Sequence, residues 1–398
     1  MSRIQIQNFG AIKEQDTWVE IKKVTFFIGN QGSGKSTVAK LISIFSWIEK
    51  TLVKKSYNPE WFEKNKLFRD FFLRYHRLEN YLKENTLIHY EGEAFIIDYE
   101  HGQLSFKEKE DIQYLLPQIM YVPSERNFIS YMKSIKELKI ASLALNDFLE
   151  EYTYAKEALE EIELPINNTS LAYDKNKDTL YIKGEDYRVL LSESSSGFQS
   201  LAPLYLVSSY LANRVKNRAT PMSIEESKIF QEQVKEIYTN PLLSEEQRRI
   251  AINALSFKFN KTSFINIVEE PEQNLFPTSQ RDMLYSLLEI NNRSKGNKLI
   301  ITTHSPYLLN YMSVVIKAGK LKQEVTDQRQ DEINAIVPIS SATEGDDLAI
   351  YELNEKSGSI QLLGNYNGIP SDDNLLNLQI DETNNLFADL LDLQEQWQ

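Results

Sequence analysis

The sequence lacks cysteine, long apolar runs, internal repeats and low-complexity segments, and each absence excludes a class of protein. Without cysteine the chain can form no disulfide, thiolate metal site or cysteine nucleophile. No apolar run reaches the ~18 residues of a membrane-spanning helix. Residues 1–7 alternate polar and apolar side chains, unlike the apolar core of a signal peptide. We therefore expect a soluble protein of the cytoplasm with no membrane partner.

The negative charge is concentrated at the C-terminal end of the chain. The 398 residues include 44 Lys and Arg and 57 Asp and Glu, which gives a formal net charge of −13. Residues 344–398 hold twelve acidic residues and one basic residue, Lys356, and so account for −11 of that charge. The rest of the chain is nearly neutral, so the overall acidity does not exclude a basic surface that binds nucleic acid.

The spacing of apolar residues predicts an α/β protein. Continuous apolar runs, which are typical of buried strands, occur at residues 24–28, 119–122, 264–268 and 299–303. Helical patterns lie between these runs, while residues 3–9 and 86–106 show the alternation and turns of short strands. We therefore expect a mostly parallel central sheet, an antiparallel N-terminal β part and helical insertions.

The most specific motif follows the first apolar run and precedes a helical pattern. It fits GxxxxGK[ST], the P-loop, and consists of Gly29, Asn30, Gln31, Gly32, Ser33, Gly34, Lys35, Ser36 and Thr37. The glycines let backbone N–H groups curl around a phosphate, and the helix N-terminus favours negative charge. Lys35 is predicted to reach the β- and γ-phosphates and Ser36 to bind Mg²⁺. A glycine turn at a helix cap is the alternative, which this context disfavours.

Acidic residues and a histidine follow two of the central strands. Glu269 and Glu270 come directly after the run at 264–268, and the carboxyl edge of a parallel sheet is where ligands bind. Glu269 is predicted to hold Mg²⁺ through water, and Glu270 to orient or deprotonate the attacking water. His304 follows the next strand and is a candidate sensor of the γ-phosphate. The alternatives are a solvated acidic turn and a structural histidine.

A serine-rich segment, residues 194–200, precedes an apolar helix. A serine hydroxyl, the glycine N–H and the helix N-terminus can together bind a phosphate, although a serine N-cap explains the same residues. The sequence alone does not place this segment beside the P-loop of its own chain.

The order of these four motifs resembles the ABC-type ATPases of the RecF/SMC and OLD (overcoming lysogenization defect) group, over about residues 1–315. The resemblance implies an ABC-ATPase head that forms head-to-tail dimers around two ATP molecules, with Ser195 and Gly197 acting on the partner's P-loop. It implies hydrolysis of ATP to ADP and phosphate by Glu270, His304 and Lys35, with Ser36 and Glu269 as Mg²⁺ ligands. The loop at residues 272–277 would lie near the dimer interface.

The chain departs from this group at the Q-loop, whose glutamine is not evident. Residues 121–127 occupy the corresponding strand end, and Ser124 and Glu125 are both candidate substitutes. No core ATPase residue is lost, and we expect slow turnover.

The interval between the P-loop and the serine-rich segment is too short for the long coiled-coil arm of SMC proteins. The chain after Pro306 is too short for the Toprim nuclease domain of OLD proteins.

We therefore interpret the chain as the ATPase subunit of a bacterial anti-phage defence system, similar to that of the PARIS system. It would assemble through ATP into a dimer or higher oligomer and control a separate effector such as a Toprim nuclease. A RecF-like DNA-repair ATPase with DNA as partner is the alternative, and a nucleotide-locked scaffold is a third.

Two segments outside the ATPase motifs are distinctive. Residues 50–83 hold nine Lys and Arg against four Asp and Glu, with aromatic residues between them. Nucleic-acid binding is one interpretation, and amphipathic helices with an aromatic core and a solvated basic face are the other. In the acidic end we expect strands at 348–351 and 360–363 and a helix at 386–393, which together could dock a basic partner.

We divide the chain into five parts on this basis. They are an N-terminal ATPase lobe with the P-loop (1–48), a basic and aromatic insertion (49–118), a strand with a helical lid (119–175), a lobe with the signature, Walker B and His-switch motifs (176–343), and an acidic C-terminal extension (344–398).

Overall fold

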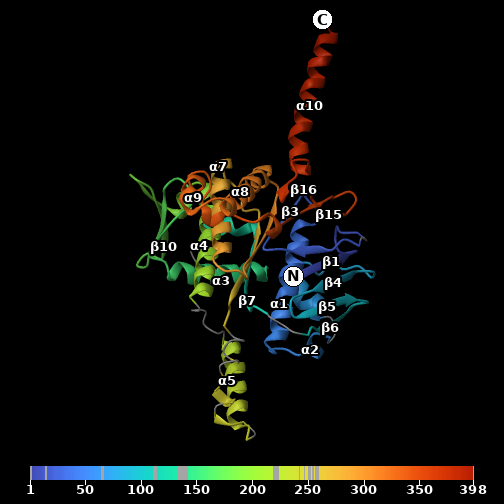
Figure 1. Cartoon of the computed structure of the whole chain (residues 1–398), viewed down its shortest axis with the longest axis vertical. Helices are drawn as coiled ribbons and strands as arrows, with labels where there is room; N and C mark the ends of the chain where they lie inside the picture. The colour runs from blue at the N-terminus through green and yellow to red at the C-terminus, as the bar shows by residue number, and fades with distance from the viewer. Residues whose placement is uncertain are drawn as a thin grey trace.

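A central sheet of six strands runs through the body of the protein (Figure 1). The computed structural model describes residues 2–13, 16–63, 67–110, 114–131, 142–217, 224–241, 243–245, 247–249, 252, 255 and 260–397. In spatial order the strands are β15 (Ile360–Leu362), β14 (Leu348–Leu353), β3 (Val24–Gly29), β13 (Lys298–Thr303), β12 (Ser263–Glu269) and β7 (Pro117–Val122). All neighbours are parallel except β15 with β14, so the carboxyl ends of the other strands share one edge.

The strands of this sheet supply two hydrophobic cores because their side chains alternate between its faces. On β3, Val24, Phe26 and Ile28 belong to one core and Phe27 to the other. Helix α1 (Lys35–Val53) covers the Phe27 face. The opposite face is covered by helices listed here with their bounds: α3 (Leu143–Glu157), α4 (Ser196–Lys216), α7 (Pro277–Asn292) and α8 (Pro306–Glu324).

A second, antiparallel sheet packs on the other side of α1. Its strands, in spatial order, are β2 (Val19–Ile21), β1 (Ser2–Gln7), β4 (Leu87–Glu91), β5 (Phe95–Glu100) and β6 (Gln103–Glu108). Glu49 of α1 is buried and ties the two layers together, since it accepts hydrogen bonds from the Tyr90 hydroxyl (3.0 Å) and the Ala94 amide (2.6 Å). This sheet is the antiparallel N-terminal part that the sequence predicts.

The sequence pattern predicts the helical lid over residues 129–163, and the structure realises it only in part. Residues 132–141 lie outside the described residues, and α3 ends at Glu157. The helix prediction is wrong at its end, because Glu161–Glu163 form β8 and pair with β9 instead. The resulting sheet has the order β11 (Arg188–Leu190), β10 (Thr179–Lys183), β9 (Ser170–Asp174) and β8. The turn at Pro165 is closed by the Leu164 amide on the Thr169 carbonyl (2.8 Å).

The aromatic residues of segment 50–83 mostly pack against one another. The segment contains α2 (Pro59–Glu63) and a π-helix, η1 (Phe68–Leu73). Tyr57 stacks on Trp61 with ring centroids 4.1 Å apart, and Phe62 and Phe72 are buried in the same core. Phe71 and Tyr81 are exceptions, with 47% and 41% of their surfaces exposed. This packing favours the interpretation of an aromatic core with a solvated basic face.

The acidic end of the chain begins inside the central sheet. β14 lies between β3 and β15, so the sheet extends past residue 344. A short hairpin, β16 (Asn365–Tyr366) and β17 (Ile369–Pro370), then leads to α10 (Leu375–Gln396), which is longer than the helix expected at 386–393. Figure 1 shows α10 projecting from one end of the body and α5 (Ile224–Thr239) from the other. The smaller α9 (Asp327–Asn334) packs near α8.

The predicted architecture is confirmed: an α/β fold with a P-loop after β3, a mostly parallel central sheet and an antiparallel N-terminal part. The described residues contain no long coiled coil, since α10 and α5 each project singly (Figure 1). None of the helices in the described part of the chain combines the length and the apolar character needed to cross a membrane.

Candidate functional site

The P-loop connects the carboxyl end of β3 to the first turn of α1. Gly29, Gly32 and Gly34 have φ angles of 147°, 75° and 103°, a region that side chains rarely adopt. A Cβ atom on Gly29 would also lie 2.2 Å from the Leu353 carbonyl oxygen of neighbouring β14. These glycines therefore allow a turn that no other residue could make beside this sheet.

The Lys35 ammonium lies inside that turn. Its Nζ donates to the carbonyl oxygens of Gly29 (2.9 Å) and Asn30 (2.8 Å). Burial lowers the pKa of Lys35 to about 8, although the surrounding carboxylates, led by Glu270, oppose this shift. Lys35 is thus a cation held at the position where a phosphate would meet the loop.

The other P-loop residues divide into an exposed rim and a buried base. Asn30, Gln31 and Gly32 are exposed, and Asn30 Nδ2 donates to Glu355 (3.3 Å). The buried residues are Ser33 and Thr37, while Gly34 and Ser36 are half-buried. Ser33 Oγ has no hydrogen-bond partner within the described structure.

Glu269 ends β12 beside the first turn of α1. One carboxylate oxygen, Oε2, accepts from the Ser124 amide (3.2 Å), and the other, Oε1, is buried with no partner among the described residues. Glu269, Ser36 and Glu125 line the same cavity of about 230 Å³. Carboxylate and hydroxyl oxygens are ligands that Mg²⁺ prefers, so the orphaned oxygen fits a hydrated Mg²⁺. In the described residues there is no group of three His, Cys, Asp or Glu that could hold a metal by itself. Phosphate oxygens and water would therefore complete such a site.

Glu270 and His304 face each other across the ends of β12 and β13. Glu270 Oε1 lies 3.8 Å from His304 Nε2, and both side chains are about one-third exposed. Burial, and then the neighbouring Glu269 carboxylate, raise the pKa of Glu270. Burial, and then the Lys35 charge, lower the pKa of His304. The raised pKa makes the Glu270 carboxylate a stronger base, and the lowered pKa keeps His304 neutral as a hydrogen-bonding group.

The Glu272 side chain fixes the loop that carries His304. Its Oε1 accepts from the Thr303 hydroxyl (2.7 Å) and the His304 amide (2.8 Å), and burial raises its pKa. Glu272 is half-buried, while Asn274 and Phe276 of the same loop are exposed, Phe276 at 72%. The prediction that residues 272–277 lie near a dimer interface stays a prediction.

Arg126 is the functional residue that sequence reasoning missed. It lies in the 3-10 helix η2 (Ser124–Tyr131) after β7 and is fully buried. Its guanidinium donates to main-chain carbonyl oxygens of Pro123 (3.2 Å), Ser200 (3.2 Å), Glu269 (2.6 Å) and Glu270 (2.5 Å). Burial lowers the pKa of Arg126 to about 10, against the pull of the nearby glutamates. A charged residue directly after a buried strand was the only available signal.

The serine-rich segment lies at the N-terminus of α4. Ser195 is the N-cap residue and is exposed, and its side chain makes no capping hydrogen bond. A Cβ atom on Gly197 would lie 3.0 Å from the Asn274 carbonyl oxygen, so this segment packs on the loop after Glu272. Within the described residues, no hydrogen bond joins Ser195 or Gly197 to residues 29–37. The structure thus brings Lys35, Ser36, Glu269, Glu270 and His304 together and leaves Ser195 and Gly197 outside this group.

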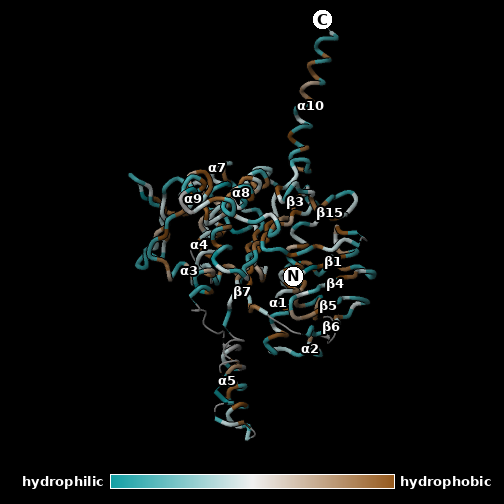
Figure 2. Tube along the Cα trace, viewed as in Figure 1, coloured by the Kyte–Doolittle hydropathy of each residue, from teal (hydrophilic) through white to brown (hydrophobic). Residues whose placement is uncertain are grey.

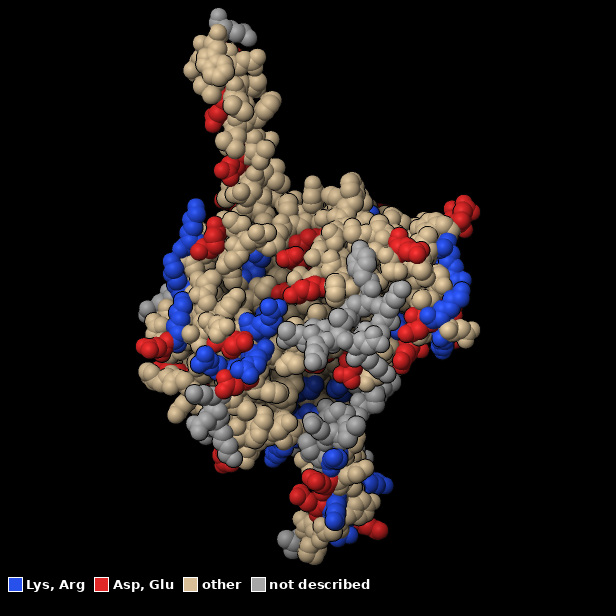
Figure 3. Space-filling model, turned by 180° about the vertical axis from the view of Figure 1, so that it is seen from behind, with Lys and Arg blue, Asp and Glu red and all other residues tan. Residues whose placement is uncertain are grey.

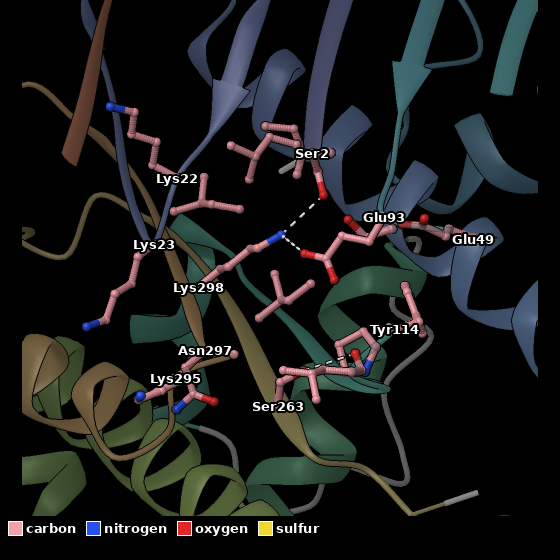
Figure 4. Close-up of a pocket in the computed structure, with 18 of the residues that line it drawn as sticks. Ser2, Lys22, Lys23, Glu49, Glu93, Tyr114, Ser263, Lys295, Asn297 and Lys298 are labelled. Atoms are coloured by element: carbon pink, nitrogen blue, oxygen red, sulfur yellow. Dashed lines mark hydrogen bonds and ion pairs between the residues drawn. The ribbon is translucent and has the colours of Figure 1, made fainter. Parts of the chain in front are cut away.

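A separate cavity of about 280 Å³ lies at the opposite edge of the central sheet (Figure 4). Lys298 projects into it and donates to Ser2 Oγ (3.2 Å) and Glu93 Oε1 (2.9 Å). This cavity is formed at the amino ends of β12 and β13, whereas ligands of parallel sheets bind at the carboxyl ends. The carboxyl edge is therefore the candidate active site.

Comparison with known proteins gives one family match. A family described as AAA ATPase domain matches residues 1–263 and 246–309. Among solved structures, the SMC head domain from Thermotoga maritima is 10% identical over 92% of this chain and 98% of its own, with a TM-score of 0.37. The recombination mediator protein RecF-ATPrS is 11% identical over 91% of this chain and 97% of its own, with a TM-score of 0.31. A search of curated proteins finds no match. The family match spans every motif described at this edge.

We expect Arg126→Met to destabilise the protein by about 3 kcal/mol or more, because several buried carbonyl oxygens lose their donor. Urea denaturation measures the change. The control is Arg329→Met, whose side chain is 66% exposed and whose loss should change stability by no more than about 0.5 kcal/mol. Equal effects of the two substitutions would contradict the role given to Arg126.

Proposed function

The chain belongs to the AAA ATPase domain family, and on that premise we propose that it binds ATP with Mg²⁺ at the carboxyl edge of the central sheet and hydrolyses it. The observation that carries the proposal is the grouping of the Lys35 ammonium, the Glu269 carboxylate and the Glu270–His304 pair at the ends of three adjacent strands.

Each of these residues has a role in the proposed reaction. The amides of residues 29–37 and the Lys35 ammonium bind the β- and γ-phosphates. Ser36 and Glu269 hold Mg²⁺, which neutralises charge on the phosphate oxygens when it is bound. Glu270 orients the attacking water and accepts its proton, and His304 contacts the γ-phosphate. Glu125 is the better substitute for the Q-loop glutamine, because its side chain lines the cavity with Glu269.

We further propose that the site is completed by a second copy of the chain, with Ser195 and Gly197 of each copy placed on the other's bound ATP. The exposure of Ser195 and its uncapped position at the N-terminus of α4 support this. The assembled form would be an ATP-sandwiched dimer or a higher oligomer in the cytoplasm.

The exposure and composition of the projecting helix α10 favour the proposal that the chain binds a separate protein partner. No residue of α10 is buried in the described structure, and it carries five acidic and no basic residues. Figure 2 shows hydrophobic positions recurring along it, and Figure 3 shows acidic but no basic side chains on the visible face of its described residues. Its large exposed residues are Leu378, Ile380, Leu386, Phe387, Leu390, Leu391 and Leu393, followed by Trp397. An amphipathic helix of this kind binds an apolar groove, and carboxylates beside its apolar face select a groove with a basic rim.

The biological setting that we propose is anti-phage defence, with α10 docking an effector such as a Toprim nuclease and ATP controlling the assembly. A RecF-like DNA-repair ATPase that binds DNA across its dimer is equally compatible with the fold and the site. The two proposals differ in the partner, so partner binding decides between them.

Glu270→Gln should slow ATP hydrolysis at least ~100-fold and trap ATP-bound assemblies, because the proton acceptor is removed while the binding residues stay. Phosphate release and light scattering with ATP measure both effects. Glu289→Gln on α7, where the side chain is 48% exposed, makes the same chemical change away from the site. A Glu270→Gln protein that stays monomeric with ATP and turns over normally would refute the assignment. A wild-type protein that retains ATP without turnover would indicate a nucleotide-locked scaffold.

Replacing Phe387 and Leu390 by serine should abolish co-purification with a Toprim nuclease encoded beside the protein, while ATP affinity stays unchanged. The two residues are 64% exposed and lie on the same side of α10. Asn385→Ser, on the opposite side of the helix, is the control and should retain the partner. Retention of the nuclease by the double variant would rule out α10 as its docking site.

Arg69→Ala combined with Arg74→Ala tests the RecF-like alternative on exposed residues of the basic segment. Lys64 and Lys66, which also belong to this segment, lie outside the described residues. Since the neighbouring aromatic residues are largely core, we expect unchanged affinity for duplex DNA and an unchanged salt dependence. Weaker binding with a salt slope reduced by about two would favour the DNA-binding alternative.

A further inference from the structure

The cavity beside Glu269 extends away from the P-loop toward the basic insertion. It has a volume of about 230 Å³ and is lined by Ser36, Lys40, His76, Tyr121 and Glu269, among others. These residues come from α1, from the turn after the π-helix η1, from the end of β7 and from the end of β12. A water molecule occupies about 30 Å³ in the liquid, so the cavity has room for several.

Three buried polar atoms on this cavity share one property. Tyr121 OH, His76 Nδ1 and Glu269 Oε1 are all buried and make no hydrogen bond of regular geometry among the described residues, and the Tyr121 hydroxyl lies beside the Glu269 carboxylate. His76 is 3% exposed, Tyr121 is 5% and Glu269 is 4%. Buried polar groups in folded proteins are almost always paired, with protein or with ordered water. Atoms of this kind around one polar cavity leave hydrogen-bonding positions open to ordered water.

The side chains are close neighbours. The rings of His76 and Tyr121 meet edge to face with centroids 4.8 Å apart, and the Lys40 ammonium lies 5.9 Å from the centre of the Tyr121 ring. The Tyr121 hydroxyl can donate a hydrogen bond, and a neutral imidazole at His76 offers one donor and one acceptor.

We propose that His76 and Tyr121 are positioning residues that hold the water shell of a divalent cation at Glu269, and thereby fix this carboxylate for metal binding. This inference rests on the proposed function, since the ligand is a hydrated Mg²⁺ bound with a nucleoside triphosphate. The cavity leads from Ser36 and Glu269 to His76, which belongs to the insertion. Outer-shell partners of this kind change metal affinity by about 10- to 100-fold.

The same contacts link the metal to the insertion. His76 follows the π-helix directly, and π-helical turns are often found at functional sites. The preceding residue, Tyr75, donates to Asp147 of α3, so this turn is held against the helix that covers the other side of the sheet. A water shell that orders His76 would therefore also order the turn at the end of the basic segment.

The test is Tyr121→Phe, which removes one oxygen and leaves the ring. In the full chain with ATP, a Mn²⁺ titration followed by electron paramagnetic resonance should show at least ~10-fold weaker metal binding. ATP affinity measured in EDTA should stay unchanged. Tyr90→Phe removes a buried tyrosine hydroxyl from Glu49, away from this cavity, and should leave the metal titration unchanged.

His76 gives a second readout that a purely structural role would not produce. His76→Phe should weaken Mn²⁺ binding, and His76→Gln, which keeps hydrogen-bonding groups, should restore part of it. If Tyr121→Phe binds Mn²⁺ as the wild type does, this inference fails whether or not the His76 variants fold. If the wild-type protein binds no Mn²⁺ with ATP, the proposed function fails as well, so the two failures are distinguishable.

Discussion

The hydrogen bonds of the buried Arg126 guanidinium fix the geometry on which the candidate site depends. They join the main chain at the ends of β7 and β12 to the N-terminal part of α4. Arg126 binds the carbonyl oxygens of both Glu269 and Glu270, so the backbone that carries these two side chains is fixed. Glu270 also has a positive φ angle of 44°, a costly conformation that such contacts must maintain. One buried cation thus sets the positions of two carboxylates with different tasks.

The polar groups at this edge are of two kinds. Arg126 and Glu272 bind main-chain atoms and fix the loops, whereas Lys35, Glu269, Glu270 and His304 keep atoms available to a ligand. Glu272 fixes its loop through one carboxylate oxygen, which binds both the Thr303 hydroxyl and the His304 amide, while its other oxygen has no partner among the described residues. Buried charges are normally compensated, so the partly unsatisfied members of the second group indicate where charge from a ligand is expected.

Sequence reasoning succeeded where the information is local. The P-loop is one contiguous segment, and glycines, lysine and hydroxyl residues between a strand and a helix have few alternatives. Glu269 and Glu270 were identifiable because they follow a continuous apolar strand. Arg126 was not, since its partners are up to 144 residues away and a buried arginine leaves no local pattern. The place of β14 beside β3 was also hidden, because an apolar run does not specify its neighbour in a parallel sheet.

The position of β14 beside β3 shows where the acidic C-terminal end is attached to the body of the protein. Glu352 of β14 pairs in register with Ile28, one residue before the P-loop begins, and its carboxylate accepts the Leu375 amide (2.8 Å) at the start of α10. The exposed helix is therefore anchored at the nucleotide edge and not attached through a free linker. Glu355, just beyond β14, also accepts a hydrogen bond from Asn30 of the P-loop rim. The P-loop rim and the start of α10 are thus joined through one strand and two hydrogen bonds, which is a short physical connection between the proposed nucleotide site and the proposed docking helix.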